Sequence, residues 1–404
     1  MILIEQSGNV KNIVLKKMKN NFCVIPWISI TSDNAGLVRP CCKFAEKDVQ
    51  GEYQTPSLKD YSYEDIWNGP EMQAIRQAFL DDKKIPECSS CWKEEEAGLT
   101  SYRNQYNHTF LRQIDPKDYS TTYAEPPRVV DLKLSNVCNF KCRMCDFSYS
   151  SLILKEDKAF RGYDIPDESY YLSNKILNTE NEDYFFKKIV PNLIQIEFTG
   201  GEPFVSPEAR KLINILSQSE HAKNIAINIT TNGSKVNTSI LSQLENFKFI
   251  RIGLSVDDIG PRAEYQRKGT VWETVRHNCK LFNDNKKFYV NLHPTINNYS
   301  IWNFDKTLEW AKENNIKVVT NILHGPERLC IKNLSAYSKS KVYEKHKDNK
   351  DMVSILSYMM QEGDDLTEDF IRETEWIDSI RNESFKEVFP DWSEIIYGSL
   401  QSPS

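Results

Sequence analysis

The sequence predicts an α/β fold for the middle of the chain, and two observations carry this prediction. Between residues 128 and 323, segments that alternate apolar and polar residues, as β-strands do, are separated by segments with helical periodicity. Strands joined through helices pair in parallel, because the right-handed crossover returns each strand in the same direction. The alternation alone allows an open barrel or a doubly wound sheet.

Six strands and four helices are expected in this region. We expect the strands at residues 128–135, 193–199, 224–231, 249–256, 288–295 and 316–323. The intervening helices are expected at residues 206–219, 234–246, 269–283 and 302–314. Reactive groups in βα folds gather at the carboxyl ends of the strands. The residues that directly follow each strand are therefore the first candidates for a site.

The regions on either side of this α/β segment differ from it. Residues 1–100 carry five cysteines, short apolar runs and one expected helix at 63–79, which predicts a small Cys-rich α+β domain. Residues 101–127 are polar, end in a Pro-Pro pair and are predicted to be a linker. We expect the α/β domain to span residues 128–328, and residues 329–404, rich in Lys, Glu and Asp, to form a helical C-terminal extension.

Composition limits the class of protein. The 404 residues are 40% hydrophobic, enough for a sizeable core, and the formal charge of −6 gives no support for a nucleic-acid partner. No stretch approaches the roughly 20 apolar residues of a membrane span, and the N-terminus lacks the pattern of a signal peptide. Ten cysteines without a secretory signal favour metal ligation over disulfides. We therefore expect a cytoplasmic protein that does not bind membranes.

Three cysteines follow the first expected strand at the spacing C-x3-C-x2-C: Cys138, Cys142 and Cys145. Thiolates are soft ligands, and three on one loop can each bind an iron of a [4Fe–4S] cluster while the fourth iron stays open. The alternative is three buried or disulfide-bonded cysteines. The second expected strand runs into Gly200-Gly201-Glu202-Pro203, a turn whose glycine backbone a ligand can approach closely.

A cysteine loop after one strand and GGEP after the next resembles the radical S-adenosylmethionine (SAM) superfamily, over residues 128–325. The resemblance implies a partial (β/α)6 TIM-like barrel, a [4Fe–4S] cluster on the three cysteines, and SAM on the open iron. It also implies that Gly200, Gly201 and Glu202 bind the SAM amino group. Further positions that match the family's SAM contacts are Phe140, Asn232, Ser255, Asp257 and Arg267.

Each of these further positions has an ordinary structural alternative. Phe140, matched to a residue near adenine, can simply pack in the loop, and Asn232 can belong to a common β–α turn. Asp257, matched with Ser255 to the ribose contact, can cap a helix. Arg267, like Arg262, is a candidate for the SAM carboxylate as a forked donor, yet either can be an exposed arginine beside a helix.

A second set of cysteines precedes the barrel. Cys23, Gly36 and Cys41 have the form C-x12-G-x4-C, and Cys88-x-x-Cys91 supplies two more thiols. The pattern resembles the twitch domain, a shortened relative of the SPASM domain, in a permuted, N-terminal position. The resemblance implies an auxiliary [4Fe–4S] cluster on four cysteines. A four-cysteine zinc site is the alternative, and Cys42 competes with Cys41 as the ligand.

Other cysteines and histidines give weaker signals. Cys279 is expected to be a small buried residue in a helix, and Cys330 follows the last strand without a spaced partner. His293 lies in the fifth expected strand and is read as a core or pocket histidine. Residues 148–191, rich in Tyr, Asp and Glu, are either a wall of a substrate cleft or a helical surface insertion.

The resemblance implies an enzyme that cleaves SAM reductively to a 5′-deoxyadenosyl radical, which abstracts a substrate hydrogen atom. A peptide or protein side chain is the favoured substrate. The alternative is a dehydrogenase or modifying enzyme acting on a sugar, nucleotide or aminoglycoside-like molecule, and a third class is a non-catalytic iron–sulfur protein. An electron donor such as flavodoxin or ferredoxin is the implied partner.

Overall fold

The structure is a computed structural model that describes residues 20–45, 55–111, 119–162, 171, 179–236 and 238–401. The chain divides into two compact units. Unit 1 comprises Met1–Leu132 and Asn174–Gln195, and unit 2 comprises Lys133–Ser173 and Ile196–Ser404. The predicted N-terminal domain and linker both fall within unit 1, whereas most of the predicted barrel and the C-terminal extension fall within unit 2.

Unit 1 is a small α+β assembly around one central strand. Strand β1 (Ser29–Ser32) pairs in antiparallel fashion with β2 (Val38–Arg39) and in parallel with β3 (Val129–Leu132). The helices of this unit are α2 (Tyr63–Trp67), α3 (Pro70–Leu80), α4 (Ser89–Glu96), α5 (Tyr102–Phe110) and α8 (Thr179–Tyr184).

Two details of unit 1 differ from the sequence-based expectations. The helix expected at 63–79 is two helices, because Gly69-Pro70 interrupts it and proline is tolerated only in the first turn of the second helix. The segment expected as a linker contains α5, whose Tyr106 and Phe110 are buried. Apolar residues at i and i+4 give this helix the buried face that its polar composition conceals.

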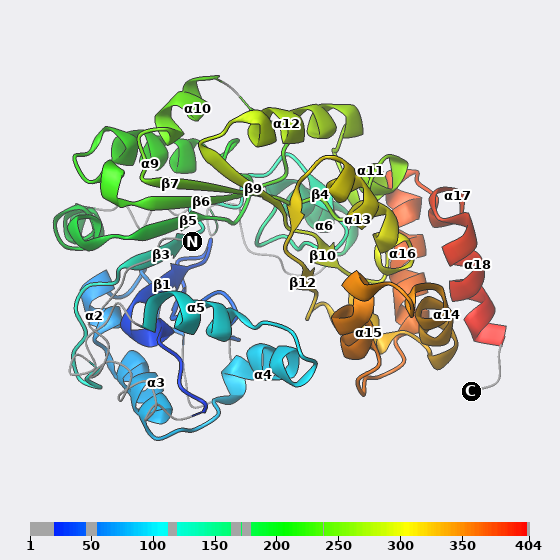
Figure 1. Cartoon of the computed structure of the whole chain (residues 1–404), viewed down its shortest axis with the longest axis horizontal. Coiled ribbons are helices and arrows are strands. Elements are labelled where there is room, and N and C mark those ends of the chain that lie inside the picture. Colours follow the sequence, from blue (N-terminus) through cyan, green and yellow to red (C-terminus); the bar gives the residue numbers. More distant parts are fainter. Residues whose placement is uncertain are drawn as a thin grey trace. The chain divides into compact units, whose positions relative to one another are not determined.

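Unit 2 contains a sheet with helices beside it (Figure 1). The strand order is β11-β9-β7-β6-β5, and the β6–β7, β7–β9 and β9–β11 pairs are parallel. The strands are β5 (Gln195–Phe198), β6 (Ala226–Thr231), β7 (Phe249–Leu254), β9 (Phe288–Leu292) and β11 (Lys317–Val318). The α/β class and the parallel sheet are therefore confirmed, and the open strand order is compatible with a partial barrel.

The helices between these strands lie close to their predicted positions. They are α9 (Pro207–Gln218), α10 (Thr238–Leu244), α12 (Trp272–Asp284) and α13 (Phe304–Glu313). Figure 1 shows α9, α10 and α12 together on one side of the strands. The capping residue Ser206 and the Pro207 that follows start α9, which buries Leu212 and Leu216.

Two predicted strands are each divided into two short ones. The fifth ends at Leu292 and resumes as β10 (Thr295–Ile296), and the sixth resumes as β12 (Asn321–Ile322). The short strands β10 and β12 pair with each other in parallel. Pro294 explains the first break, because proline has no N–H to donate to a neighbouring strand.

The C-terminal extension is helical, as predicted. It contains α14 (Ala336–His346), α15 (Val353–Met359), α16 (Thr367–Arg381), α17 (Phe385–Val388) and α18 (Pro390–Gly398). Tyr299 of the barrel segment packs against Phe370 and Phe385, with ring centroids 4.9 and 5.8 Å apart. No helix in the described part of the chain combines the length and apolar composition that crossing a membrane requires.

Candidate active site

The three predicted cluster cysteines lie on one loop of unit 2, here called the cluster loop (residues 137–146). Cys142 is buried and forms part of β4 (Lys141–Cys142), while Cys138 and Cys145 are half-buried. Burial raises the pKa of the Cys138 thiol to about 12, and burial also raises the pKa of Cys142 and Cys145. Such thiols become thiolates only beside a cation, so the donor set fits an iron–sulfur cluster.

The GGEP turn is joined to the cluster loop through the backbone. The Glu202 N–H donates to the Val137 carbonyl at 2.8 Å, and the Gly201 N–H donates to the Ser135 carbonyl at 3.2 Å. A Cβ atom at Gly201 would lie 2.2 Å from the Val137 carbonyl oxygen, so only glycine fits there. Gly200 has a φ of 102°, which L side chains rarely adopt. Both glycines therefore allow the turn to lie against the loop.

The Glu202 carboxylate holds the end of β6 against this turn. It accepts hydrogen bonds from the Thr231 hydroxyl and from the Asn232 N–H, each at 2.7 Å. Burial raises the pKa of Glu202 to about 7. Because protein donors use this carboxylate, Glu202 stabilises the site itself. Its contact with the SAM amino group stays a prediction.

Asn232 connects the same strand end to the cluster loop. Its side-chain amide donates to the Asn139 side-chain oxygen at 3.0 Å, and Asn139 in turn donates to the Ser234 hydroxyl at 2.9 Å. Sequence reasoning missed Thr231 and Asn139. Thr231 directly precedes Asn232, and Asn139 lies between two cluster cysteines. These positions are the signal that could have identified both residues.

Four of the predicted cofactor contacts surround one small cavity. It has a volume of about 10 Å³, and its lining includes Asn232, Ser255, Asp257 and Arg267. These side chains follow the carboxyl ends of β6 and β7 or, for Arg267, start β8 (Arg267–Lys268). The structure thus brings together residues that lie up to 35 positions apart in the chain.

Within this cavity wall Asp257 and Arg267 pair with each other. The Arg267 Nε and Nη2 donate to the two carboxylate oxygens at 2.6 and 3.0 Å, and the Thr295 N–H adds a third bond at 2.7 Å. Arg267 Nη1 lies 3.7 Å from Cys142 Sγ, because β8 pairs with β4. Burial by itself would lower the pKa of Arg267, but the charge of the Asp257 carboxylate raises it above its usual value. The contacts of both residues with SAM stay predictions.

Phe140 and Arg262 are also in defined positions. Phe140 is buried, and a Cβ atom at Gly269 would lie 2.9 Å from its ring. The Ser150 hydroxyl donates to the Phe140 carbonyl at 2.7 Å, which ties the cluster loop to the start of α6 (Ser151–Phe160). Arg262 pairs with buried Asp258 at 2.9 Å.

A large open cleft begins at the cluster loop. It has a volume of about 960 Å³, is open to solvent, and has Cys142 and Cys145 in its lining. Apolar and charged side chains share its walls. They include Met144, Phe147, Ile153, Arg161, Arg328, Leu366, Glu373 and Ile377. Arg161 and Arg328 both pair with Glu373, at 2.6 and 3.1 Å. The predicted insertion at 148–191 contributes Ile153 and Arg161, and part of it lies outside the described residues.

The N-terminal cysteines of the predicted second site all lie within unit 1. Cys23, Cys41 and Cys91 are buried and Cys88 is half-buried, whereas Cys42 is exposed. Burial raises the pKa of Cys41, and the charges of Cys42, Cys88, Cys23 and Cys91 raise it further. Among the described residues, no three His, Cys, Asp or Glu side chains converge as ligands of a single metal ion.

Cys279, Cys330 and His293 have the surroundings of residues that stabilise the fold. Cys279 is buried within α12, and Cys330 is buried and donates to the Pro326 carbonyl at 3.6 Å. The ring of His293 covers Gly253, where a Cβ atom would lie 2.5 Å from it. Burial lowers the pKa of His293 to about 4, so the ring is neutral near pH 7.

Comparison with protein-family models finds two matching segments. Residues 132–328 match the Radical SAM superfamily, and residues 23–92 match the SPASM family, described as an iron–sulfur cluster-binding domain. Each segment contains one of the two sets of cysteines. Compared by sequence with curated proteins, the chain matches none.

Solved structures give weaker similarities. Native anSMEcpe with bound AdoMet is 20% identical, with 63% of this chain and 62% of that chain covered and a TM-score of 0.38. SuiB of Streptococcus suis bound to S-adenosylmethionine is 16% identical, with 68% and 62% covered and a TM-score of 0.39. The chain thus spans 62% of the length of each.

Proposed function

Since the chain belongs to the radical SAM superfamily and carries a SPASM-type iron–sulfur domain before its barrel, we propose that it is a peptide- or protein-modifying enzyme. In this proposal, Cys138, Cys142 and Cys145 hold the cluster that cleaves SAM, and the substrate loses a hydrogen atom in the adjoining cleft. The observation that carries the proposal is the set of direct hydrogen bonds between the cluster loop, the GGEP turn and the end of β6.

Held by Cys138, Cys142 and Cys145, a [4Fe–4S] cluster would supply the electron for the reductive cleavage of SAM to methionine and a 5′-deoxyadenosyl radical. The protein's residues position these groups. The bonds from Gly201 and Glu202 hold the GGEP backbone beside the cysteines, where we propose that it receives the SAM amino group. Asn232, Ser255 and Asp257, which line the small cavity, are the proposed contacts of the nucleoside.

The cleft supports an extended substrate. Its volume of about 960 Å³ is at the upper end of the about 300–1,000 Å³ that pockets for drug-sized ligands occupy. Because the cleft is open to solvent, a chain longer than a small molecule can extend out of it. Side chains such as Leu366 and Ile377, next to the Arg161–Glu373 pair, give both apolar contacts and hydrogen-bonding groups. A peptide offers both kinds of partner along its length.

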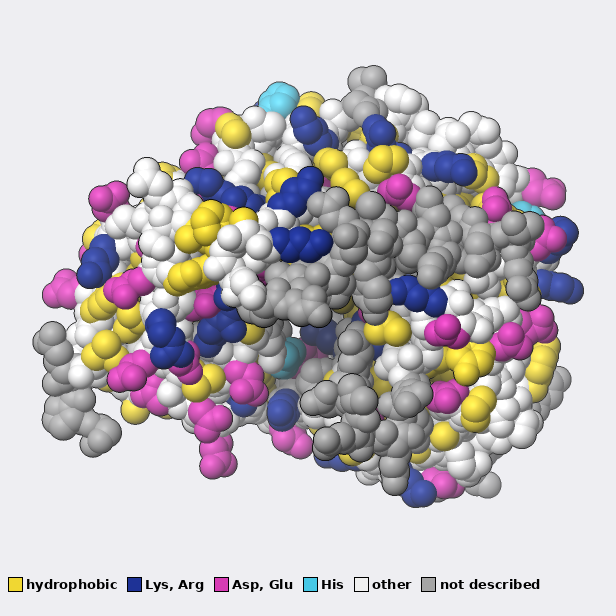
Figure 2. All heavy atoms as spheres, turned by 180° about the vertical axis from the view of Figure 1, so that it is seen from behind, with side chains coloured by type: hydrophobic (Ala, Val, Ile, Leu, Met, Phe, Trp, Pro, Cys, Tyr) yellow, Lys and Arg dark blue, Asp and Glu magenta, His cyan; other side chains and the backbone are white. Residues whose placement is uncertain are grey.

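The second site is proposed to hold the auxiliary [4Fe–4S] cluster on Cys23, Cys41, Cys88 and Cys91. Cys41 is the proposed ligand because it is buried, as Cys23 and Cys91 are, whereas Cys42 is exposed. We propose an electron donor of the flavodoxin or ferredoxin class. Figure 2 shows acidic and basic side chains interspersed on the face in view, which gives no support for a nucleic-acid partner.

The test uses the anaerobically reconstituted, dithionite-reduced chain with SAM and two deuterated mixtures. One is a digest of bacterial proteins, and the other contains sugars and nucleotides. We expect 5′-deoxyadenosine to form and to acquire deuterium from the peptide mixture, as measured by mass spectrometry. Deuterium from the small molecules alone would favour the small-molecule enzyme. Absence of 5′-deoxyadenosine from a chain with its full iron content would favour a non-catalytic protein.

A further inference from the structure

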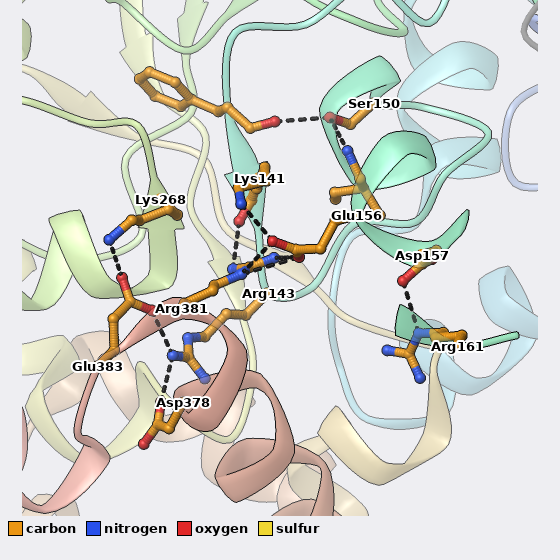
Figure 3. A network of polar contacts seen from close by, with 12 residues as sticks. Lys141, Arg143, Ser150, Glu156, Asp157, Arg161, Lys268, Asp378, Arg381 and Glu383 are labelled. Carbon is orange, nitrogen blue, oxygen red and sulfur yellow. Dashed lines mark hydrogen bonds and ion pairs between the residues drawn. The ribbon is translucent and has the colours of Figure 1, made fainter. Parts of the chain in front are cut away.

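Helix α16 of the C-terminal extension contacts the cluster loop on both sides of Cys142 (Figure 3). Arg381 Nη1 donates to the Lys141 carbonyl oxygen at 2.8 Å. One turn earlier on the helix, Asp378 accepts a hydrogen bond from the guanidinium of Arg143. The residue before the cysteine and the residue after it are therefore both bound by a single helical turn.

Arg381 is itself held in place from α6. Its Nη2 lies 2.6 Å from the Glu156 carboxylate, and the two side chains are only 3% and 8% exposed. Glu156 also binds the ammonium of Lys141. Charge-assisted hydrogen bonds in such a buried place are strong, and loss of one partner leaves the other charge unpaired. These bonds hold the Arg381 side chain in a defined position relative to the cluster loop.

Arg143, on the other side of Cys142, is also held by residues of the C-terminal extension. Its side chain is fully buried, and its Nη2 binds Glu383 at 2.7 Å in addition to Asp378. The guanidinium lies over the ring of Tyr265, 3.6 Å from the centroid, and the Tyr265 hydroxyl donates to Asp378 at 2.7 Å. These contacts explain why a charged residue is buried between two cluster cysteines.

The electrostatic surroundings of Cys142 agree with this geometry. Arg267 Nη1 lies 3.7 Å from Cys142 Sγ, and Arg381 binds the carbonyl of the residue before Cys142. Positive charges near a thiolate-bound cluster favour its reduced, more negative state. Arg381 thus has two effects on the same site: it fixes the backbone of the loop and adds a positive charge near a ligand.

We propose that Arg381 is a positioning residue for Cys142, and that the C-terminal extension is part of the cluster-binding machinery. The proposal rests on the proposed function, because it takes Cys142 to be a cluster ligand. It adds that a residue of the extension, separated from Cys142 by most of the barrel segment, determines how firmly the cluster is held and how readily it is reduced.

The test compares Arg381→Met, Arg381→Lys and Arg276→Met in the full, reconstituted chain. Arg276 is the matched control, because it is an exposed arginine on α12 paired with Glu273 at 2.6 Å. The readouts are the rate of iron loss to a chelator, the midpoint potential, and the change that SAM causes in the electron paramagnetic resonance (EPR) signal. SAM perturbs the cluster with the open iron and so identifies it.

For Arg381→Met we expect about tenfold faster iron loss from the SAM-responsive cluster, the equivalent of one charged hydrogen bond, and a more negative potential. Arg381→Lys should restore part of the potential, and Arg276→Met should match the unchanged chain. Equal rates and potentials for Arg381→Met and the unchanged chain would overturn the proposal. If Arg381→Met does not fold, Glu156→Gln removes the carboxylate that holds Arg381. We then expect faster iron loss and a less negative potential, and an unchanged rate of iron loss would overturn the proposal. If the chain without substitutions shows no EPR change on addition of SAM, the proposed function is refuted instead.

Discussion

The cluster loop and the N-terminal cysteine site are both built from buried and half-buried thiols, but the chain assembles them in different ways. The cluster loop carries all three of its cysteines on one short continuous segment of unit 2. The N-terminal site takes Cys23, Cys41 and the Cys88–Cys91 pair from separate segments of unit 1. The first geometry is largely local, and the second depends on tertiary packing.

In both regions, an arginine paired with a glutamate binds the backbone next to a cysteine. Arg381 pairs with Glu156 and donates to the carbonyl just before Cys142. Arg103, on α5, pairs with Glu95 and donates at 2.8 Å to the Phe22 carbonyl, just before Cys23. A position next to a ligand is thus held by a cation from far along the chain. Cysteine spacing alone gives no sign of this arrangement.

The largest expected effect distinguishes the cluster loop from the N-terminal cysteine site. Changing Cys138, Cys142 and Cys145 together to Ala should abolish formation of 5′-deoxyadenosine, because no iron remains for SAM to bind. Iron content should fall from about eight to about four atoms per chain, those of the N-terminal cluster. Iron analysis and chromatography of the reaction products measure the two quantities. SAM cleavage that survives the triple change would contradict the assignment of the cluster loop.

The next effect concerns the N-terminal site alone. Cys41→Ser should remove about four irons per chain and leave SAM cleavage in place, since the cluster loop lies in the other unit. Cys42→Ser is the matched control, because Cys42 is the neighbouring residue and is exposed. Iron loss from Cys42→Ser and not from Cys41→Ser would reverse the ligand assignment. Four irons and one zinc in the unchanged chain would show a zinc site instead.

The sequence predicted the parts of the fold that depend on local pattern. The strand and helix positions of the barrel segment follow from periodicity, and the Cys138 to Cys145 spacing and the Gly200-Gly201 turn follow from short motifs. It did not predict α5, whose two buried aromatic residues are set among polar ones. It also missed the bonds from Glu202 to Thr231 and from Arg381 to Lys141, which join residues far apart in the chain. Such contacts exist only once the fold brings the residues together.

The smallest expected effect tests whether Arg103 of unit 1 holds the backbone next to Cys23 as Arg381 of unit 2 holds the backbone next to Cys142. The Arg103 and Glu95 side chains are 10% and 21% exposed, against 3% and 8% for Arg381 and Glu156, so water compensates more of a lost bond. Arg103→Met should lower the free energy of unfolding by about 1 kcal/mol, measured by denaturant titration, and should speed iron loss from the N-terminal cluster. Lys84→Met is the control, since it removes an exposed cation over the same Trp92 ring that Arg103 covers. If both variants behave alike, Arg103 acts through Trp92 packing, and the parallel with Arg381 fails.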